Sequence, residues 1–357
     1  GLLAHLDGNG DAAEACFRAA IAADPGRGDA YANLGALLWA RESGAQAFDL
    51  LERGVVLAPE NADALESYCV AAKALGEAAR AAAVVREARG LHPVHRGLTF
   101  ALIDLLLASA QLEPAMREIE NALDWFPLDD GLLRAALAIR AQVGPRRVPD
   151  DDASRGTVSL CMIVKNEATN LVRCLRSAMP VVDEMIVVDT GSTDGTGDLA
   201  AALGAHVTTF EWSGDFSAAR NEALATANGE WVLVLDADEA LATSDLPRLR
   251  AIVRGESRDR AAGYAMTTRN YSTAANTAGW TPNDGAYARD EAGTGWYPSR
   301  KVRLFRNDAR IRFEGELHEV VEHSLRRHGL AVKPLDVPVH HYGPLNAERE
   351  RDKGGDY

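Results

Sequence analysis

The sequence is poor in cysteine and in positive charge, and each scarcity excludes some classes of protein. Only 4 cysteines occur in 357 residues. They are far apart and form no C-x-x-C pair, so neither a zinc knot nor a disulfide framework is supported. The net charge of −14 argues against a surface built for nucleic acid or anionic membranes. No apolar run approaches the roughly 20 residues that span a bilayer.

The remaining composition is that of an ordinary globular protein. Hydrophobic residues make up 47% and charged residues 25% of the chain, and the length predicts about two domains. The first residues lack the charged and apolar blocks of a signal peptide. We expect buried free thiols and a cytoplasmic location. Residues 344–357 look like the start of a helical extension, so we expect the chain to be part of a longer one.

A 34-residue period runs through residues 1–143. Prolines recur at this spacing, and small residues precede each proline by five and by twelve positions. Small residues mark places where paired helices cross closely, and a proline ends the second helix of each pair. The positions are Pro25, Pro59, Pro93 and Pro127, with Ala20, Gly54, Ala88 and Ala122, and with Ala13, Ala47, Ala81 and Ala115. The pattern resembles the tetratricopeptide repeat, which implies an all-α solenoid that binds peptides or proteins. A rigid spacer or a dimerisation arm is the alternative.

Residues 144–156, with two prolines, two glycines and a run of charges, predict a linker. Beyond it strand and helix patterns alternate four times, which predicts a parallel, doubly wound α/β sheet. We expect strands at residues 158–164, 185–188, 206–210 and 231–235, and helices near 169–179, 198–203 and 217–227. Further strands are expected at 304–307 and 311–313.

The strongest indication of a functional site lies at residues 230–239, where an apolar run is followed by three carboxylates. The run predicts a strand buried on both faces, and ligands bind at the carboxyl ends of such strands. Asp236 and Asp238 alternate with Ala237, so both can border one crevice. Clustered carboxylates favour a cation, and Mg²⁺ or Mn²⁺ suits oxygen ligands. On this stretch alone, acidic residues that cap the next helix explain the pattern equally well.

Four motifs in order resemble the nucleotide-sugar-dependent glycosyltransferases of family 2, which have the GT-A fold. They are residues 162–167, 187–196, 215–221 and 235–239. The resemblance covers residues 157–343 and implies a Rossmann-like nucleotide-diphospho-sugar transferase domain. Joined to tetratricopeptide repeats, such a domain is similar to bacterial peptide and protein glycosyltransferases.

This resemblance implies an inverting, metal-dependent hexosyl transfer from a nucleoside-diphosphate sugar, expected to be a UDP-sugar, to a peptide or protein acceptor that the repeats hold. One alternative acceptor is a cell-surface glycan or a lipid-linked sugar. An alternative of another class is a nucleotide-binding scaffold without turnover, and a nucleotidyltransferase is a distant third. A homodimer is compatible with this organisation.

The resemblance also assigns roles on the donor side. Asp189 is expected to bind the base or ribose of the nucleotide, and Asp236 to face the ribose or a bound water. The end of the first strand lines the same pocket with Lys165, Asn166 and Glu167. Arg220 is a candidate contact of the pyrophosphate, with a salt bridge to Glu222 or Asp215 as the alternative.

Asp238 is expected to hold the metal on the diphosphate. The resemblance further implies that a late histidine completes the metal shell. Only one of His340 and His341 can do so, because neighbouring strand residues point oppositely, and we favour His340. The resemblance also implies a carboxylate general base after the D-x-D motif, for which Glu319 is the prediction and Glu316 the alternative. The H-E pair that ends at Glu319 does not complete an H-E-x-x-H motif, because position 322 is a glutamate, which disfavours a zinc protease.

The long segment between Tyr271 and Tyr297 predicts a binding loop or lid. It contains Trp280, and also Trp296, which immediately precedes Tyr297. The two tryptophans could stack on sugar rings or pack the loop against the domain.

Overall fold

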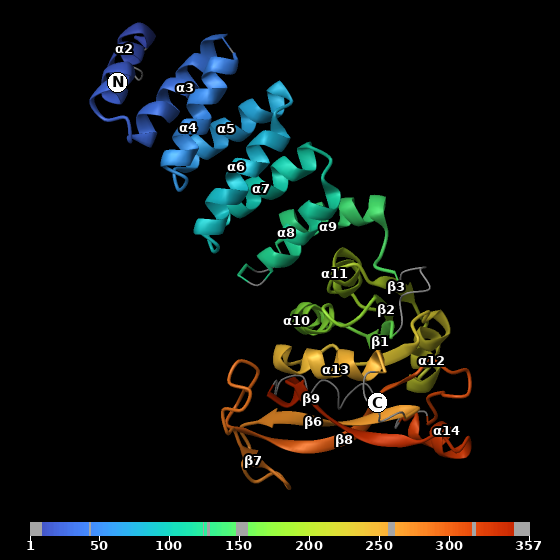
Figure 1. Ribbon diagram of the computed structural model, residues 1–357. Coiled ribbons are helices and arrows are strands. Elements are labelled where there is room, and N and C mark those ends of the chain that lie inside the picture. The colour runs from blue at the N-terminus through green and yellow to red at the C-terminus, as the bar shows by residue number, and fades with distance from the viewer. Residues whose placement is uncertain are drawn as a thin grey trace. The chain divides into compact units, whose positions relative to one another are not determined.

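The computed structural model describes residues 9–42, 44–123, 125–126, 129–147, 156–255, 261–315 and 319–345. The chain divides into two compact units, residues 1–139 and 140–357 (Figure 1). Most of the predicted linker, the end of the predicted C-terminal extension and the alternative base Glu316 lie outside the described residues.

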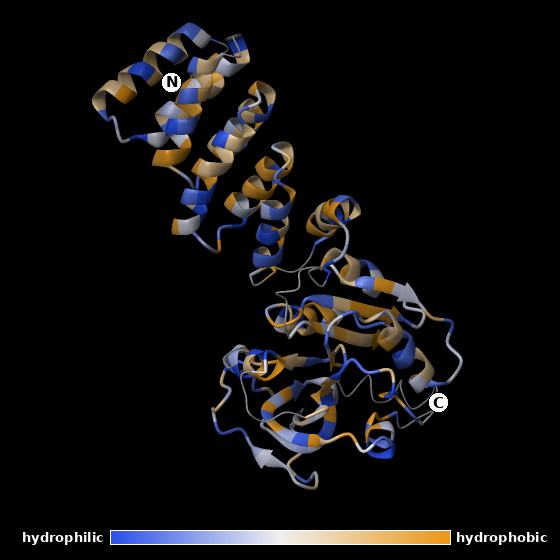
Figure 2. Ribbon diagram, turned by 45° about the vertical axis from the view of Figure 1, so that its right-hand side comes forward, coloured by the Kyte–Doolittle hydropathy of each residue, from blue (hydrophilic) through white to orange (hydrophobic). Residues whose placement is uncertain are grey.

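The first unit is a stack of antiparallel helices. From α2 to α8 each helix packs against the next one, and alternate helices also contact each other, as α3 does with α5 and α5 with α7. Figure 2 shows hydrophobic and hydrophilic bands alternating along these helices, as amphipathic helices require. The helices are α2 (Gly10–Ala23), α3 (Gly28–Glu42), α4 (Ala45–Leu57), α5 (Ala62–Leu75), α6 (Ala78–Leu91), α7 (Arg96–Ala108), α8 (Leu112–Ala122) and α9 (Asp130–Val143). The predicted solenoid of helix pairs is confirmed.

The small residues of the 34-residue period mark the places where helices cross, as predicted. A Cβ added to Gly54 of α4 would lie 2.9 Å from both the Cβ and the backbone nitrogen of Ala32 in α3. The small residues at the other periodic position, such as Ala47 and Ala81, are almost fully buried. The small residues of the repeat therefore lie where neighbouring helices approach each other closely.

We expect Gly54→Ala to destabilise the first unit by about 1 kcal/mol or more, because overpacking outweighs the gain in helix propensity. Gly90→Ala in α6 is the matched control, since nothing lies within 4 Å of its added Cβ. We expect this change to stabilise the same unit by about 1 kcal/mol. Hydrogen exchange of peptides from the first unit in increasing urea measures both effects. If both substitutions stabilised the unit, the close crossing at Gly54 would be refuted.

The second unit is built on one mixed sheet. Nine strands of the described residues form it, in the order β3-β2-β1-β4-β8-β6-β9-β5, and β7 pairs with β8. The strands are β1 (Val158–Val164), β2 (Glu184–Asp189), β3 (His206–Thr209), β4 (Trp231–Val234), β5 (Glu239–Leu241), β6 (Gly263–Ser272), β7 (Thr281–Pro282), β8 (Gly295–Arg306) and β9 (Val332–His341). The helices are α10 (Ala168–Ala178), α11 (Thr196–Ala202), α12 (Phe216–Thr226), α13 (Leu246–Val253) and α14 (Glu322–Arg327), with 3₁₀ turns η1 (Thr243–Asp245) and η2 (Gly343–Leu345).

The predicted parallel sheet is right for one half of the unit and wrong for the other. Strands β3, β2, β1 and β4 are parallel, but β8 runs antiparallel to both β4 and β6. The strand expected at residues 311–313 does not form, because side chains bind its backbone instead. Asn221 bonds both the nitrogen and the oxygen of Phe313, and the hydroxyl of Ser324 accepts from the nitrogen of Arg312.

The core that supports the site lies where α12 packs on β1 and β2. Val188, Val232 and Phe305 are among its fully buried residues. Cys69, Cys161 and Cys174 are buried free thiols as expected, whereas Cys16 is exposed, which corrects the expectation for that residue. In the described ranges, no helix combines the length and apolarity that a membrane crossing requires.

Candidate functional site

Strands β1 and β2 end side by side, because Val164 pairs with Asp189 in the parallel register. Asp189 is 8% exposed, and its Oδ1 accepts from the backbone nitrogens of Gly191 at 3.0 Å and Ser192 at 2.7 Å. Its Oδ2 borders Gly197, where an added Cβ would lie 3.2 Å away. One oxygen thus fixes the turn and the other faces the space that this glycine leaves.

The residues that follow β1 are hydrogen-bonded to the residues that follow β2. Asn166 has a φ of 55°, a left-handed conformation that asparagine tolerates better than most residues. Its Oδ1 accepts from the nitrogen of Thr193 at 2.8 Å, and its own nitrogen donates to Ser192 Oγ at 3.0 Å. The nitrogen of Glu167 donates to Thr196 Oγ1 at 2.9 Å. Asn166 and Glu167 therefore shape the predicted pocket, while Lys165 is exposed beside them.

Arg220 of α12 joins two of the predicted site carboxylates. Its Nη2 donates to Asp236 Oδ1 at 2.7 Å and its Nε to Glu319 Oε1 at 3.0 Å. The alternative partners, Glu222 and Asp215, are not the ones it binds, and Asp215 instead caps α12 by accepting from the nitrogen of Ala218. Only Nη1 of Arg220, which lacks a hydrogen-bond partner among the described residues, remains for the predicted pyrophosphate contact.

A second buried arginine, Arg303 of β8, was missed by the sequence analysis. Its Nη1 lies 3.5 Å from Asp236 Oδ2, and its Nη2 donates to Glu239. Burial would raise the pKa of Asp236, but the charges of Arg220 and Arg303 outweigh it and hold that pKa well below its usual range. The sequence offers little signal for it, because Arg300, Lys301 and Arg306 of the same strand are charged as well.

Glu239 serves the structure of this site. It is 2% exposed, and its Oε2 accepts from the backbone nitrogen of Asp236 at 2.8 Å. Its other oxygen accepts from Arg303. Burial raises the pKa of Glu239, Arg303 opposes this rise, and Asp236 adds to it. Glu239 therefore fixes the backbone at Asp236 and leaves Asp238 as the carboxylate that faces β9.

His341, and not His340, lies beside Asp238. The nitrogen of Tyr342 donates to the backbone oxygen of Asp238 at 3.0 Å, and His341 Nε2 lies 3.4 Å from Asp238 Oδ2. His340 is fully buried, and its Nδ1 forms a 2.7 Å hydrogen bond with the hydroxyl of Tyr271. The preference for His340 is therefore corrected. Adjacent strand residues do point oppositely, but the register of β9 turns the second histidine toward Asp238.

Asn270 of β6 sets the tautomer of His341 and was also missed. Its Oδ1 lies 2.7 Å from His341 Nδ1, while its Nδ2 donates to the oxygen of Tyr297 and to Ser299 Oγ. These two donor bonds fix the orientation of the amide. Because Oδ1 can only accept, Nδ1 of His341 carries the proton, and in the neutral ring Nε2 offers a lone pair on the side of Asp238.

Residues 159–311 match the family model described as glycosyl transferase family 2. The second unit contains a family 2 glycosyltransferase domain. A protein of Synechococcus elongatus, named TPR repeat-containing protein, is 42% identical over 48% of this chain and 37% of its own length. An uncharacterized glycosyltransferase of Rickettsia felis is 36% identical over 30% of this chain and 38% of its own length. The chain thus spans less than two fifths of these curated relatives. The solved structure titled S. aureus TarS 1–349 in complex with UDP has a TM-score of 0.37 at 17% identity, and covers 52% of this chain and 60% of that one.

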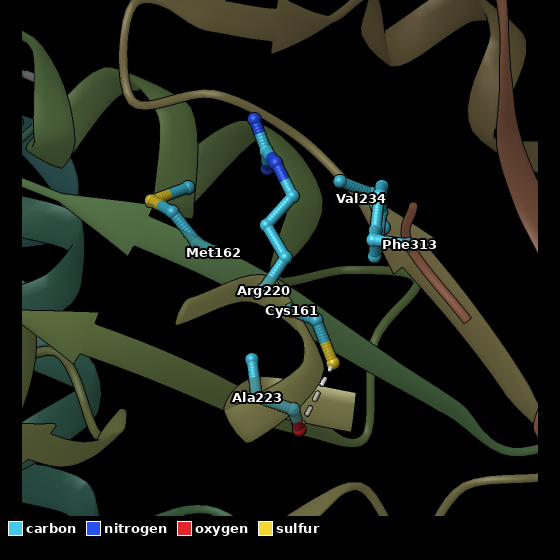
Figure 3. A pocket seen from close by; sticks show the side chains of 6 residues that line it. All are labelled: Cys161, Met162, Arg220, Ala223, Val234 and Phe313. Carbon is cyan, nitrogen blue, oxygen red and sulfur yellow. Dashed lines mark hydrogen bonds between the residues drawn. The ribbon is translucent and has the colours of Figure 1, made fainter. Parts of the chain in front are cut away.

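The glycosyltransferase domain has a small gap beneath Arg220, which Figure 3 shows. Its lining residues are Cys161, Met162, Arg220, Ala223, Val234 and Phe313, and it does not admit a water molecule. In Figure 3 the guanidinium of Arg220 extends away from Cys161 and Ala223 at the foot of the gap. This gap is packing around the stem of the arginine and is no site for a donor.

The two tryptophans of the predicted loop pack the loop against the glycosyltransferase domain. Trp296 lies against the guanidinium of Arg269, 4.5 Å from ring centre to Cζ. Trp280 lies so close to Gly295 that an added Cβ there would be 2.5 Å from its ring. Of the two alternatives given for these tryptophans, the structure supports packing.

A divalent ion fits the chemistry of the pair formed by Asp238 and His341. A carboxylate oxygen and a neutral imidazole nitrogen are ligands that Mn²⁺ accepts. Within the described ranges, no group of three His, Cys, Asp or Glu side chains forms a complete metal site. Two protein ligands are nevertheless enough where substrate phosphates and water supply the rest, as in many Mg²⁺ sites.

We expect Asn270→Ala to weaken Mn²⁺ binding by about 10- to 100-fold, because an outer partner of a ligating histidine sets its tautomer and orientation. Titration calorimetry of the full chain with Mn²⁺ and UDP measures the affinity. Ser299→Ala, which removes one support of the amide and leaves its bond to His341 in place, should have the smaller effect. Equal affinities for Asn270→Ala and the wild type would contradict the assigned tautomer.

Proposed function

We propose that this protein transfers a sugar from a nucleoside-diphosphate sugar, a UDP-sugar in the first instance, to a peptide or protein acceptor with inversion at the anomeric carbon. The observation that carries this proposal is the 3.4 Å approach of His341 Nε2 to Asp238 Oδ2 beside Asp236, in a domain that matches family 2. The helical repeats supply the acceptor surface, because stacked helix pairs commonly bind extended peptides.

On the donor side, Asp189 Oδ2 accepts from the ribose or base, and the turn that Asn166 and Ser192 hold together forms the wall of the nucleotide pocket. Asp236 is held by Arg220 and Arg303 and faces the ribose or a bound water. The positive charge of Lys301, two residues before Arg303 on β8, also acts on Asp236 and favours the negatively charged diphosphate at this end of the sheet.

A divalent ion held by Asp238 and His341 would supply Lewis acidity to the leaving diphosphate. On the acceptor side, the hydroxyl or thiol of the acceptor attacks the anomeric carbon from the face opposite the diphosphate. The carbon–oxygen bond to the diphosphate breaks as the new bond forms, and the acceptor proton passes to Glu319. Arg220 binds Oε1 of Glu319, which leaves Oε2 to accept that proton.

The experiment that tests this function is a thermal-shift panel of nucleoside diphosphates and their sugars, with and without Mn²⁺, on the full chain. Ligand linkage raises the unfolding temperature for the true donor and for its diphosphate. Transfer to peptide libraries and to free glycans is then followed by mass spectrometry, and the anomeric configuration of the product by NMR. Binding without turnover under any metal would favour the scaffold alternative, and transfer to free glycans alone would refute the peptide acceptor.

A further inference from the structure

Gly343 lies two residues after His341, at the start of η2. It is not among the glycines of the described residues that adopt positive φ. Left-handed backbone conformation therefore does not account for a glycine at this position. The reason lies in the space that its missing side chain leaves.

That space lies between the two atoms proposed to bind the ion. A Cβ added to Gly343 would be 2.5 Å from Asp238 Oδ2 and 2.6 Å from His341 Nε2. An Mg²⁺ ion lies about 2.1 Å from its ligands, so the missing carbon and an ion would occupy nearly the same place. Two ligands at a right angle around such an ion are about 3 Å apart, close to the 3.4 Å that separates the two atoms here.

The atoms that a side chain at position 343 would meet are the ends of side chains. Both Oδ2 of Asp238 and Nε2 of His341 can withdraw without moving the backbone, so the fold can accommodate a methyl group. Their withdrawal, however, removes the two ligand atoms from their positions around one ion. A substitution at 343 should therefore act on ion binding far more than on stability.

We propose that Gly343 is a positioning residue of the ion site, whose absent side chain keeps open the space in which a divalent ion binds between Asp238 and His341. This inference rests on the proposed function, because it presupposes that the domain uses a divalent ion. It goes further than the proposed function because it gives a role in ion binding to a residue that contributes no ligand atom.

The test is Mn²⁺ binding to the full chain, with and without UDP, measured by the electron paramagnetic resonance signal of free Mn²⁺. Gly343→Ala should weaken binding at least about 10-fold, while the ion-free protein keeps its unfolding temperature. Gly90→Ala is the matched control, because it is the same substitution at a glycine with nothing within 4 Å of the added carbon. It should leave Mn²⁺ affinity unchanged.

Two further variants separate an effect on ion binding from an effect on backbone conformation. Residues before proline disfavour helical backbone when they carry a Cβ, so Gly343→Ala is repeated in a Pro344→Ala background, where the loss of affinity should persist. In a His341→Ala background, Gly343→Ala should add little further loss, because the two changes act on one site. If Gly343→Ala alone failed to fold and the double variant with His341→Ala folded, this result would directly support a collision between the added Cβ and the His341 ring.

The outcomes distinguish this inference from the proposed function. Wild-type affinity in Gly343→Ala, with binding abolished by Asp238→Ala, would overturn the role of Gly343 and leave the metal site standing. No Mn²⁺ binding by the wild type, even with UDP, would overturn the metal dependence and this inference together.

Discussion

Asp238→Ala should lower sugar transfer about 1,000-fold and abolish Mn²⁺ binding in the presence of UDP. A Lewis acid on the departing diphosphate contributes several kcal/mol, and each 1.4 kcal/mol is a factor of ten in rate. Asp238 Oδ2 faces His341 Nε2, and the neighbouring carboxylate of Glu239 is already bound to Arg303. The carboxylate of Asp236 is likewise bound, to Arg220 and Arg303, so neither neighbouring carboxylate can take the place of Asp238. Single-turnover transfer and donor hydrolysis, measured at saturating Mn²⁺, give the rate.

The matched control for this substitution is Asp308→Ala. Asp308 is an acidic residue of the same unit whose carboxylate is paired with Arg310 in its own loop. Its removal should leave both transfer and Mn²⁺ affinity within about two-fold of the wild type, as most surface substitutions do. Transfer at the wild-type rate by Asp238→Ala would refute the assignment of the metal site.

Local patterns in the sequence predicted the elements well. The apolar run before Asp236 does form β4 at Trp231–Val234, and the 34-residue period does mark helix crossings such as the one at Gly54. Both features depend on residues close in the chain, where side-chain period and size directly reflect burial. The parallel half of the sheet follows from the same alternation of strand and helix.

What the sequence could not predict depends on register between distant strands. The choice between His340 and His341 is made by the pairing of β9 with β5 and β6, in which β9 has two extra residues opposite the step from Met266 to Thr268. Arg303 reaches Asp236 only because β8 pairs antiparallel with β4. Asn270 acts on a residue 71 positions away. None of these pairings leaves a trace in local periodicity.

Removal of Arg220 should strongly lower the stability of the second unit. Arg220 is a buried cation between two carboxylates, with a side chain 9% exposed. In Arg220→Ala, Glu319 loses the one salt bridge that it forms among the described residues, although Asp236 keeps Arg303. Breaking a buried pair by removing one partner costs about 3–5 kcal/mol. Hydrogen exchange of peptides from α12 and β4 should show this loss.

Arg80 offers a matched contrast, because it joins two carboxylates in the same way but at the surface of the helical unit. It binds Asp49 at 3.0 Å and Glu52 at 2.8 Å, with a side chain 45% exposed. Arg80→Ala should therefore change the stability of its own unit by no more than about 1 kcal/mol. Equal losses from the two arginines would show that burial does not set the strength of the Arg220 pairs.

Arg220→Lys separates charge from geometry at the same position. A lysine keeps the positive charge but cannot bind two carboxylates through a planar fork. If Arg220 fixes Glu319 for proton transfer, this variant should recover most of the stability while transfer stays at least about 10-fold below the wild type, with UDP affinity unchanged. If instead Arg220 binds the diphosphate itself, UDP affinity should fall together with the rate. The comparison of UDP affinity with transfer rate thus decides between an arginine that positions the base and one that holds the leaving group.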